Sequence, residues 1–460
     1  MCEKKMTGRE ILRDPLRCAM TYAPCRKGAA LLLALMTAAY FVLILKLCGA
    51  MSGVTVVALC AALCFALMTG FAWHAAALEE KQPPVVVLLC LAALSMLAVG
   101  IHVSFLDIAP GRYTNTLKTM LDELWNYELV TAMAWEDDGW SGVYLIVCAL
   151  ISRLETFSQL YAVKLVDMIC QCLCGAAAAR LVRVRGGKAA AAVGALLACV
   201  LAPTMLLNAG CWAQCDATFA MFTLWGLYFL LSERPLAGCV LWGLALATKL
   251  QSAFLFPLLI VLFMNRKLGL GQILALLAAA LLSQIAILLD GQSLMELIGR
   301  YAVQIANVTE NAGLADVAPG VFSLMNVASV REFSGMGLYL GIASALVVVA
   351  ALLIARREIS RETLLLAALL LACGLPLILP QMNARSLYLA GMLAFCMADT
   401  PKRLAVALGL EIISLCCYMQ AIFNRIIMPL NVLSLLAIAV AVVAALELIP
   451  QLLGGREAQA

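Results

Sequence analysis

Residues 208–251 read NAGCWAQCDATFAMFTLWGLYFLLSERPLAGCVLWGLALATKLQ, and the rest of the chain can be organised around them. Polar residues stand at the outer ends of two apolar runs: Trp212, Gln214 and Asp216 before the first, Lys249 and Gln251 after the second. Ionisable groups beside hydrocarbon are costly, so a functional site is the default hypothesis for them. The alternative is that they end helices at the membrane surface, where long side chains extend toward water.

The composition identifies the class of protein. The chain has 460 residues, of which 65% are hydrophobic and 13% charged, and its mean hydropathy is +1.01. Soluble globular domains lie far from these values. Many apolar runs approach the ~20 residues that cross ~30 Å of hydrocarbon, and repeated spans of this kind must be helical. The sequence therefore predicts an all-α polytopic membrane protein with about 12–14 transmembrane helices.

The distribution of basic residues predicts the topology. Basic side chains are frequent in residues 1–28 and in several short later connections, which places these segments in the cytoplasm. The transmembrane domain is then residues 29–450, with outer loops at 106–158 and 291–334 and a cytoplasmic tail at 451–460. This topology requires that 143–158 does not cross the membrane by itself. It places Asp107 and Asp216 on the same outer face.

The first outer loop contains an amphipathic pattern. Apolar residues recur at helical spacing with charged residues between them: Tyr113, Leu117, Met120, Leu121 and Leu124 against Lys118, Asp122 and Glu123. This spacing predicts a helix that lies along the membrane surface. Acidic residues elsewhere in the loop, including Glu136, Asp137 and Asp138, are read as solvated loop positions.

Several other functions lack sequence support. Most of the nineteen cysteines fall within apolar runs, where Cys behaves as a small hydrophobic residue. Only two histidines are present, which leaves few ligands for zinc. The chain has no nucleotide-binding glycine loop, Walker motif or hydrolase elbow, and nothing in it indicates nucleic-acid binding. An energy-coupled pump is therefore not expected.

Four segments resemble the GT-C superfamily of polyprenyl-phosphate-sugar-dependent glycosyltransferases. They are SFLD at 104–107, GWSGVYLIVCALISRLE at 139–155, PTMLLNAGCWAQCDA at 203–217 and GLALATKLQSAFLFPLLI at 243–260. The resemblance is narrower to bacterial proteins related to the second mannosyltransferase of glycosylphosphatidylinositol synthesis. That group has a signature close to N-x-x-x-W-G-Q-x-D, followed by A-x-x-x-K-x-Q. The matching residues here are Asn208, Trp212, Gln214, Asp216, Ala245, Lys249 and Gln251, with Ala213 in place of the usual Gly.

A later segment departs from the group's pattern. The signature there resembles P-x-M-H-E-R-Y, and this chain keeps Pro380, Met382 and Arg385. Asn383 and Ala384 replace the usual His and Glu, and Ser386 replaces the Tyr. The departure puts in doubt any acid–base role carried by the missing His and Glu.

The resemblance implies transfer of a hexose, by analogy mannose, from a polyprenyl-phosphate carrier to a glycan, lipid or protein acceptor at the extracytoplasmic face of the cell membrane. One carboxylate must take the acceptor proton, and cations must neutralise the departing phosphate. Asp107 is the predicted base, and Asp216 the second candidate, orienting hydroxyl groups. Lys249 and Arg385 are the predicted phosphate ligands. The predicted sugar contacts are Trp212, Gln214, Gln251 and Asn383.

Alternatives stay open at this stage. Trp212 also suits the aromatic belt of a membrane interface, and Arg385 suits a helix end that extends toward water. A divalent cation, Mg²⁺ or Mn²⁺, is compatible with Asp107 and Asp216, although their spacing does not require one. A lipid or sugar flippase, a transporter and a non-catalytic GT-C relative are the competing functions. A transporter would place its ionisable residues in mid-span, often in two related halves.

Overall fold

The computed structural model describes residues 24–51, 53–77, 83–111, 113–135, 142–300, 318–325, 327–355, 359–380 and 382–453, with the backbone alone at 327–334. These residues form helices and turns, and no β-strand occurs among them. The prediction of an all-α polytopic membrane protein is confirmed. Residues 1–23 and 454–460, residues 136–141 and 301–317 of the predicted outer loops, and Gln381 lie outside the described residues.

Eight helices in the described chain are long and apolar enough to cross a membrane. They are α3 (Arg26–Leu47), α4 (Val54–Ala77), α5 (Val85–Ser104), α9 (Gln159–Val184), α18 (Val327–Ile354), α19 (Arg361–Ile378), α21 (Pro401–Phe423) and α22 (Leu430–Leu453). The helix α10 (Ala189–Leu201) and its continuation through α11 (Pro203–Leu206) and the π-helix η2 (Leu207–Trp212) are bent by 45°, and counted as one span they make nine. The bend falls where Pro203 begins a new helix and cannot continue the hydrogen bonding of α10.

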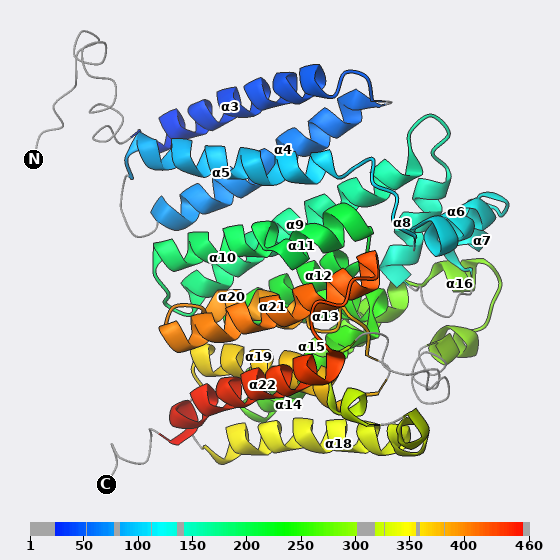
Figure 1. The fold of residues 1–460 in the computed structure, drawn as a ribbon, viewed down its shortest axis with the longest axis vertical. Coiled ribbons are helices and arrows are strands. Elements are labelled where there is room, and N and C mark those ends of the chain that lie inside the picture. The colour runs from blue at the N-terminus through cyan, green and yellow to red at the C-terminus, as the bar shows by residue number, and fades with distance from the viewer. Residues whose placement is uncertain are drawn as a thin grey trace, which may run out of the picture.

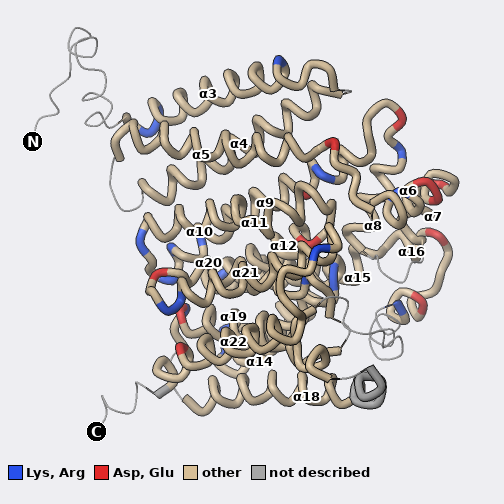
Figure 2. Tube along the Cα trace, viewed as in Figure 1, with Lys and Arg blue, Asp and Glu red and all other residues tan. Residues whose placement is uncertain are grey.

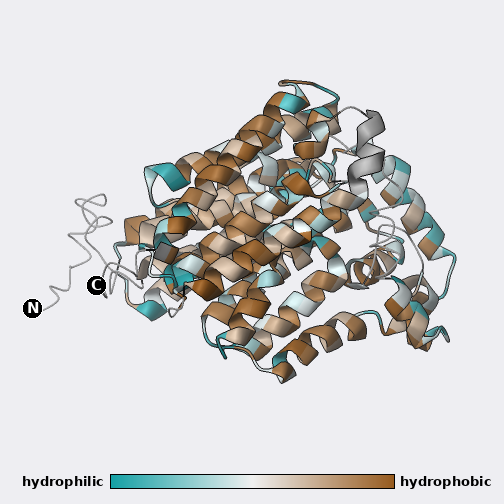
Figure 3. Ribbon diagram, turned by 90° about the horizontal axis from the view of Figure 1, so that it is seen from below, coloured by the Kyte–Doolittle hydropathy of each residue, from teal (hydrophilic) through white to brown (hydrophobic). Residues whose placement is uncertain are grey.

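Shorter apolar helices complete the bundle. They are α12 (Asp216–Leu231), α13 (Pro235–Thr248), the 3₁₀-helix η3 (Leu250–Leu255), α14 (Pro257–Met264), α15 (Leu270–Leu282) and α20 (Tyr388–Met397). The predicted count of about 12–14 crossings depends on these short helices and stays a prediction. Figures 1 and 3 show all of them within one bundle, whose helices are mostly hydrophobic along their length and hydrophilic at their ends.

Small helices gather at one end of the bundle. They are η1 (Tyr113–Leu117), α6 (Lys118–Trp125), α7 (Leu129–Met133), α8 (Gly142–Ser152) and α16 (Ala286–Leu289) (Figure 1), while η4 (Val321–Leu324) precedes α18. The apolar residues of the predicted amphipathic helix are buried, and Lys118, Asp122 and Glu123 are exposed. With eleven residues, α8 reaches only about 16 Å, too short to cross ~30 Å of hydrocarbon. It packs against α6, α7, α9 and α13 instead.

The central layer of the bundle positions the polar residues. Helix α9 packs against α4, α10 and α12, and α12 packs against α13. Figure 2 shows Lys, Arg, Asp and Glu mainly at the two ends of the bundle, with one further acidic and basic group beside the start of α12. That group lies at the breaks between η2 and α12, between α13 and η3, and between α19 and α20, and it is the candidate site.

Candidate functional site

The central polar residues stand at two points where the helices are interrupted. The π-helix η2 ends at Ala213, which has the left-handed conformation with φ 55° and ψ 58°, and α12 then begins at Asp216. On the neighbouring hairpin, α13 ends at Thr248, and Lys249 is extended, with φ −158° and ψ 128°. Lys249 therefore leaves the helical path and turns its side chain toward the first residue of α12.

Asp216 is the centre of the site and is fully buried. One of its oxygens, Oδ1, accepts a hydrogen bond from Nζ of Lys249. The other, Oδ2, lies 3.0 Å from Nη1 of Arg385 and 2.9 Å from Nδ2 of Asn208. We call Asp216, Lys249, Arg385, Asn208 and Gln214 the Asp216 cluster. Both carboxylate oxygens already accept hydrogen bonds from cations and an amide. Asp216 is therefore suited to positioning these groups rather than to accepting a proton.

Arg385 joins the cluster from the turn between α19 and α20. Its Nη1 also donates to Oε1 of Gln214 at 2.5 Å, and its guanidinium carbon lies 5.3 Å from the centre of the Trp212 ring. Its backbone N–H donates to Oδ1 of Asn383 at 3.0 Å. Its Nε is buried and has no hydrogen-bond partner among the described residues. This donor of a buried guanidinium is therefore unpaired, although buried donors are normally paired.

The remaining contacts brace the cluster. Nε2 of Gln251 donates to the backbone oxygen of Ser386 at 2.5 Å and so ties η3 to the Arg385 turn. The Tyr418 hydroxyl on α21 lies 2.9 Å from Nδ2 of Asn208, and the Tyr418 ring meets Trp212 edge-on at 5.2 Å. Seven of the eight predicted site residues are therefore assembled here from three separate segments: Trp212, Gln214, Asp216, Lys249, Gln251, Asn383 and Arg385.

The eighth predicted residue, Asp107, lies apart from the others. It is exposed just beyond α5, and its Oδ1 accepts a hydrogen bond from the Tyr161 hydroxyl on α9. Lys164, one turn further along α9, donates to the backbone oxygens of Phe105 and Ile108, each at 2.5 Å. These contacts fix the loop around Asp107. No hydrogen bond or ion pair in the described part of the chain joins Asp107 to Asp216.

A polar cavity of about 210 Å³ connects the Asp107 loop with the cluster. Trp212, Asn383 and Arg385 contribute to one part of its wall. Pro110 and Gly111, which follow Asp107 closely in the chain, line the same cavity. The loop that follows the predicted base therefore borders the same space as one predicted phosphate ligand, whereas Asp107 itself is not among the residues that line this cavity.

The charges of the cluster do not cancel. Two buried or half-buried cations face one carboxylate, which leaves an excess of one positive charge. A buried charge is stable only when it is paired and hydrogen-bonded. The excess charge, the unpaired Nε of Arg385 and the adjoining cavity together suit an anion such as a phosphate oxygen.

A shared divalent cation does not fit this arrangement. Both oxygens of Asp216 already contact cationic or amide groups, and Asp107 is hydrogen-bonded to Tyr161 and does not line the cavity. No group of three or more His, Cys, Asp or Glu side chains suited to a metal occurs in the described residues. We therefore assign no step to a metal ion.

The sequence analysis missed two buried charged residues on α9. Lys164 is 1% exposed, and Asp167, three residues further on, is fully buried. Neither carboxylate oxygen of Asp167 has a hydrogen-bond partner among the residues that the structure describes. The signal was a Lys and an Asp at helical i, i+3 spacing within an otherwise apolar span. The prediction missed both residues because the apolar run around them indicates only a membrane-spanning helix.

Comparisons with known proteins do not indicate a function, so the function is inferred from the geometry of the site. No protein-family model matches the chain, and no curated protein is significantly similar to it. Fold and site define the class: a multi-pass α-helical membrane protein with a buried, positively charged cluster beside a polar cavity. The resemblance to the GT-C superfamily stays a prediction.

Proposed function

We propose that the protein is a glycosyltransferase that moves a hexose from a polyprenyl-phosphate carrier to an acceptor hydroxyl at the outer face of the membrane. The observation that carries the proposal is the excess positive charge of the Asp216 cluster next to a polar cavity. A departing phosphate gains negative charge in the transition state, and fixed cations in a water-poor site stabilise that charge. The motif resemblance adds support and favours mannose as the sugar.

In the proposed reaction, the carboxylate of Asp107 takes the proton of the acceptor hydroxyl. The acceptor oxygen forms a bond to the anomeric carbon while the bond from that carbon to the phosphate oxygen breaks. The electron pair of the broken bond stays on the phosphate, which leaves as polyprenyl phosphate beside Lys249 and Arg385. Tyr161 orients Asp107, and the cavity wall at Trp212 and Asn383 contacts the sugar.

Gln214 and Gln251 take positioning roles in this proposal. The side-chain oxygen of Gln214 accepts a hydrogen bond from Arg385, and its Nε2 donates one to the backbone oxygen of Trp212 at 3.2 Å. The amide of Gln251 holds Ser386. Both side chains therefore act on substrate through Arg385 and its turn.

The proposal is tested by transfer of radiolabelled sugar from a panel of polyprenyl-phosphate sugars, using purified protein in lipid. We expect labelled product from wild type and a loss of about 100-fold or more in Asp107→Asn, because general base catalysis contributes on this scale. Asp122→Asn, an exposed acid on α6, is the matched control and keeps wild-type activity. Equal activity in Asp107→Asn and wild type would exclude Asp107 as the base.

A transporter or flippase is the second candidate, and one observation favours it. Asp167 is a buried carboxylate without a hydrogen-bond partner among the described residues, within a membrane-spanning helix, as in proton-coupled transporters. Under this alternative, vesicles with the purified protein would move a polyprenyl-phosphate sugar across the bilayer, and Asp167→Asn would stop this movement. Sugar transfer without any such movement would reject it.

A further inference from the structure

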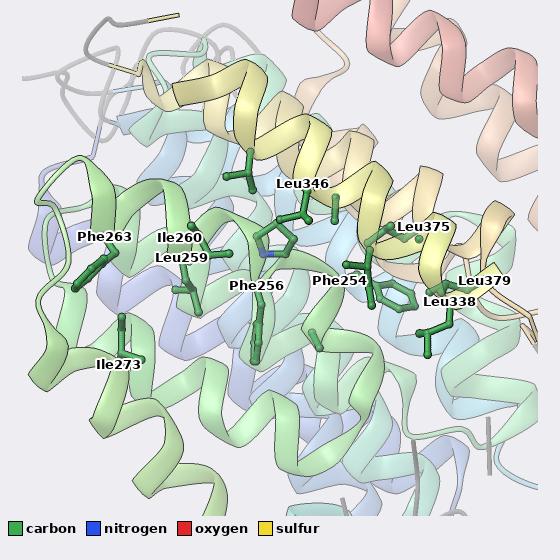
Figure 4. A pocket seen from close by; sticks show the side chains of 16 residues that line it. Phe254, Phe256, Leu259, Ile260, Phe263, Ile273, Leu338, Leu346, Leu375 and Leu379 are labelled. Carbon is green, nitrogen blue, oxygen red and sulfur yellow. The ribbon is translucent and has the colours of Figure 1, made fainter. Parts of the chain in front are cut away.

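The largest hollow among the described residues is an apolar groove of about 600 Å³ between α14 and α18. Figure 4 shows its side chains in a row, from Phe254, Leu338 and Leu379 at one end to Phe263 and Ile273 at the other. Every lining residue is apolar, and none belongs to the Asp216 cluster or to residues 105–111, which we call the Asp107 loop. Such a surface has no group that takes or gives a proton, so further residues that control the proposed reaction are expected beside the polar cavity.

Lys164 on α9 is a buried cation that contacts the Asp107 loop. It is 1% exposed, and its Nζ donates to the backbone oxygens of Phe105 and Ile108, each at 2.5 Å. It forms no ion pair with a carboxylate among the described residues, although a buried ammonium is usually paired with one. Phe105 is the residue that ends α5, and the end of a helix carries partial negative charge. The charge of Lys164 is therefore directed to the backbone of the Asp107 loop.

Asp107 stands between the two carbonyl groups that Lys164 contacts. Tyr161, which lies three residues before Lys164 on the same side of α9, donates to Oδ1 of Asp107. Two residues of one helix therefore hold the carboxylate of Asp107 and the backbone on both sides of it. The loop continues into Pro110 and Gly111, which line the polar cavity.

The same helix also contacts the turn that carries Arg385. Two turns beyond Lys164, Oε1 of Gln171 accepts a hydrogen bond from the Tyr388 hydroxyl. Tyr388 begins α20, and its backbone N–H donates to the backbone oxygen of Arg385 at 3.0 Å. Lys164 and Gln171 are seven residues, or about 10 Å, apart along α9. One rigid element therefore joins the loop of the predicted base to the turn of a predicted phosphate ligand.

From this geometry we infer that Lys164 is a positioning residue that holds Asp107 at a fixed place relative to the Asp216 cluster. The inference rests on the proposed function and deepens it by naming the residue that sets the place of the base. The base has to reach the acceptor proton while Lys249 and Arg385 contact the phosphate, so the spacing of these groups matters. Displacement of a reacting group by about 1 Å can lower a rate by about 100-fold. Lys164 acts through the Asp107 loop and not on substrate.

Lys164→Met tests this role, because Met is an unbranched side chain that donates no hydrogen bond. In sugar transfer by purified protein in lipid, we expect kcat to fall by about 100-fold. KM for the polyprenyl-phosphate donor and the affinity for undecaprenyl phosphate should change less than about twofold, because Lys249 and Arg385 keep their contacts. Retained binding of undecaprenyl phosphate also shows that the variant is folded. A wild-type kcat, or a loss that falls on carrier binding instead, would overturn the inference.

Two comparisons separate positioning from a general loss of structure. In the Asp107→Asn background, Lys164→Met should change the remaining rate by less than about threefold, because no carboxylate is left to position. An equal loss in both backgrounds would contradict a role through Asp107. Trp225→Phe is the matched control, since it removes the hydrogen bond from Nε1 of Trp225 to the backbone oxygen of Leu173 on α9, at 3.0 Å. It should keep kcat within about twofold of wild type, and a loss as large as that of Lys164→Met would overturn the inference.

Hydrogen exchange tests the hold on the loop without sugar transfer. Backbone amides of the Asp107 loop should exchange about tenfold faster in Lys164→Met than in wild type, and at the wild-type rate in Trp225→Phe. Unchanged exchange in Lys164→Met would overturn the inference even if the wild-type protein transfers sugar. Faster exchange in a protein that transfers no sugar would reject the glycosyltransferase and keep the hold of Lys164 on the loop.

Discussion

The Asp216 cluster and a second charged network at the opposite end of the bundle differ in their balance of carboxylates and cations, although each contains one buried arginine nitrogen without a partner among the described residues, Nε of Arg385 and Nη2 of Arg185. In the second network, the three guanidinium nitrogens of Arg403 contact Glu362, Asp399 and Glu447 at 2.6, 3.1 and 3.2 Å. Arg185 also contacts Asp399, at 2.7 Å. We call these five residues the Arg403 network. In the Asp216 cluster, by contrast, Arg385 uses Nη1 for its contacts and leaves Nε unpaired.

The difference separates a structural network from a ligand site. The Arg403 network has three carboxylates for two cations and ties α19, α21 and α22 together at their ends. The Asp216 cluster has one carboxylate for two cations and borders a cavity. Arg403 and Tyr418 stand on the same helix, fifteen residues or about 22 Å apart, so one rigid element carries both. Buried charge of similar kind thus joins helices at one end, whereas at the other end we propose that it binds an anion.

The largest expected effect is loss of stability in Asp216→Asn. Removing this carboxylate leaves Lys249 and Arg385 as uncompensated cations, and breaking a buried pair costs about 3–5 kcal/mol. Asp399→Asn should cost less, because the Asp399 side chain is 30% exposed and Arg403 keeps its contacts with Glu362 and Glu447. Unfolding of both variants in detergent measures the difference. Equal destabilisation would mean that the two networks are energetically alike.

The next effect concerns carrier binding. Lys249→Met removes one cation but keeps the apolar stem of the side chain. A charge-assisted hydrogen bond to phosphate contributes roughly 1.5–3 kcal/mol, so undecaprenyl phosphate should bind about 10- to 100-fold more weakly. Lys188→Met, which lies outside both charged groups, is the control and keeps the wild-type affinity. A wild-type affinity in Lys249→Met would remove Lys249 from the phosphate site.

The Arg403 network should respond to acid. Burial favours a raised pKa for Asp399, but hydrogen bonds and charges from Arg185 and Arg403 outweigh it and hold the pKa below its usual value. The stability from Asp399 is therefore complete above the unfolded pKa of about 4 and is lost as pH falls through the folded pKa. The stability difference between wild type and Asp399→Asn should shrink between pH 6 and pH 3. A stability difference that stays constant from pH 6 to pH 3 would contradict the lowered pKa of Asp399.

The smallest effect is a gain in stability in Ala213→Gly. Ala213 holds a left-handed conformation that costs a residue with a side chain about 1 kcal/mol and glycine much less. The group that this chain resembles has Gly at that position. We expect the melting temperature to rise slightly while carrier affinity is unchanged. A lower melting temperature would show that contacts of the Ala213 methyl group outweigh the strain.

The sequence predicted much of the candidate site because its residues interrupt apolar runs. Lys249 and Arg385 were predicted as phosphate ligands from the family resemblance, and the structure places both in contact with Asp216. The separation of Asp107 from Asp216 was not predicted, because it depends on how α5 and α9 pack. Asp167 was missed because it lies inside a span rather than at its end. The groove was not predicted since it is formed by helices distant in sequence, whose apolar residues look like any membrane helix.

The most direct test of the central claim compares Arg385→Gln with Arg403→Gln in sugar transfer from polyprenyl-phosphate donors. The Asp216 cluster is proposed to stabilise the departing phosphate, so Arg385→Gln should lose about 100- to 1,000-fold in rate, the scale for removing one transition-state donor. Arg403→Gln should lower the melting temperature and leave the rate of the folded protein within about threefold. If both variants lose the same activity, or Arg385→Gln keeps the wild-type rate, the Asp216 cluster is not the site of phosphate departure.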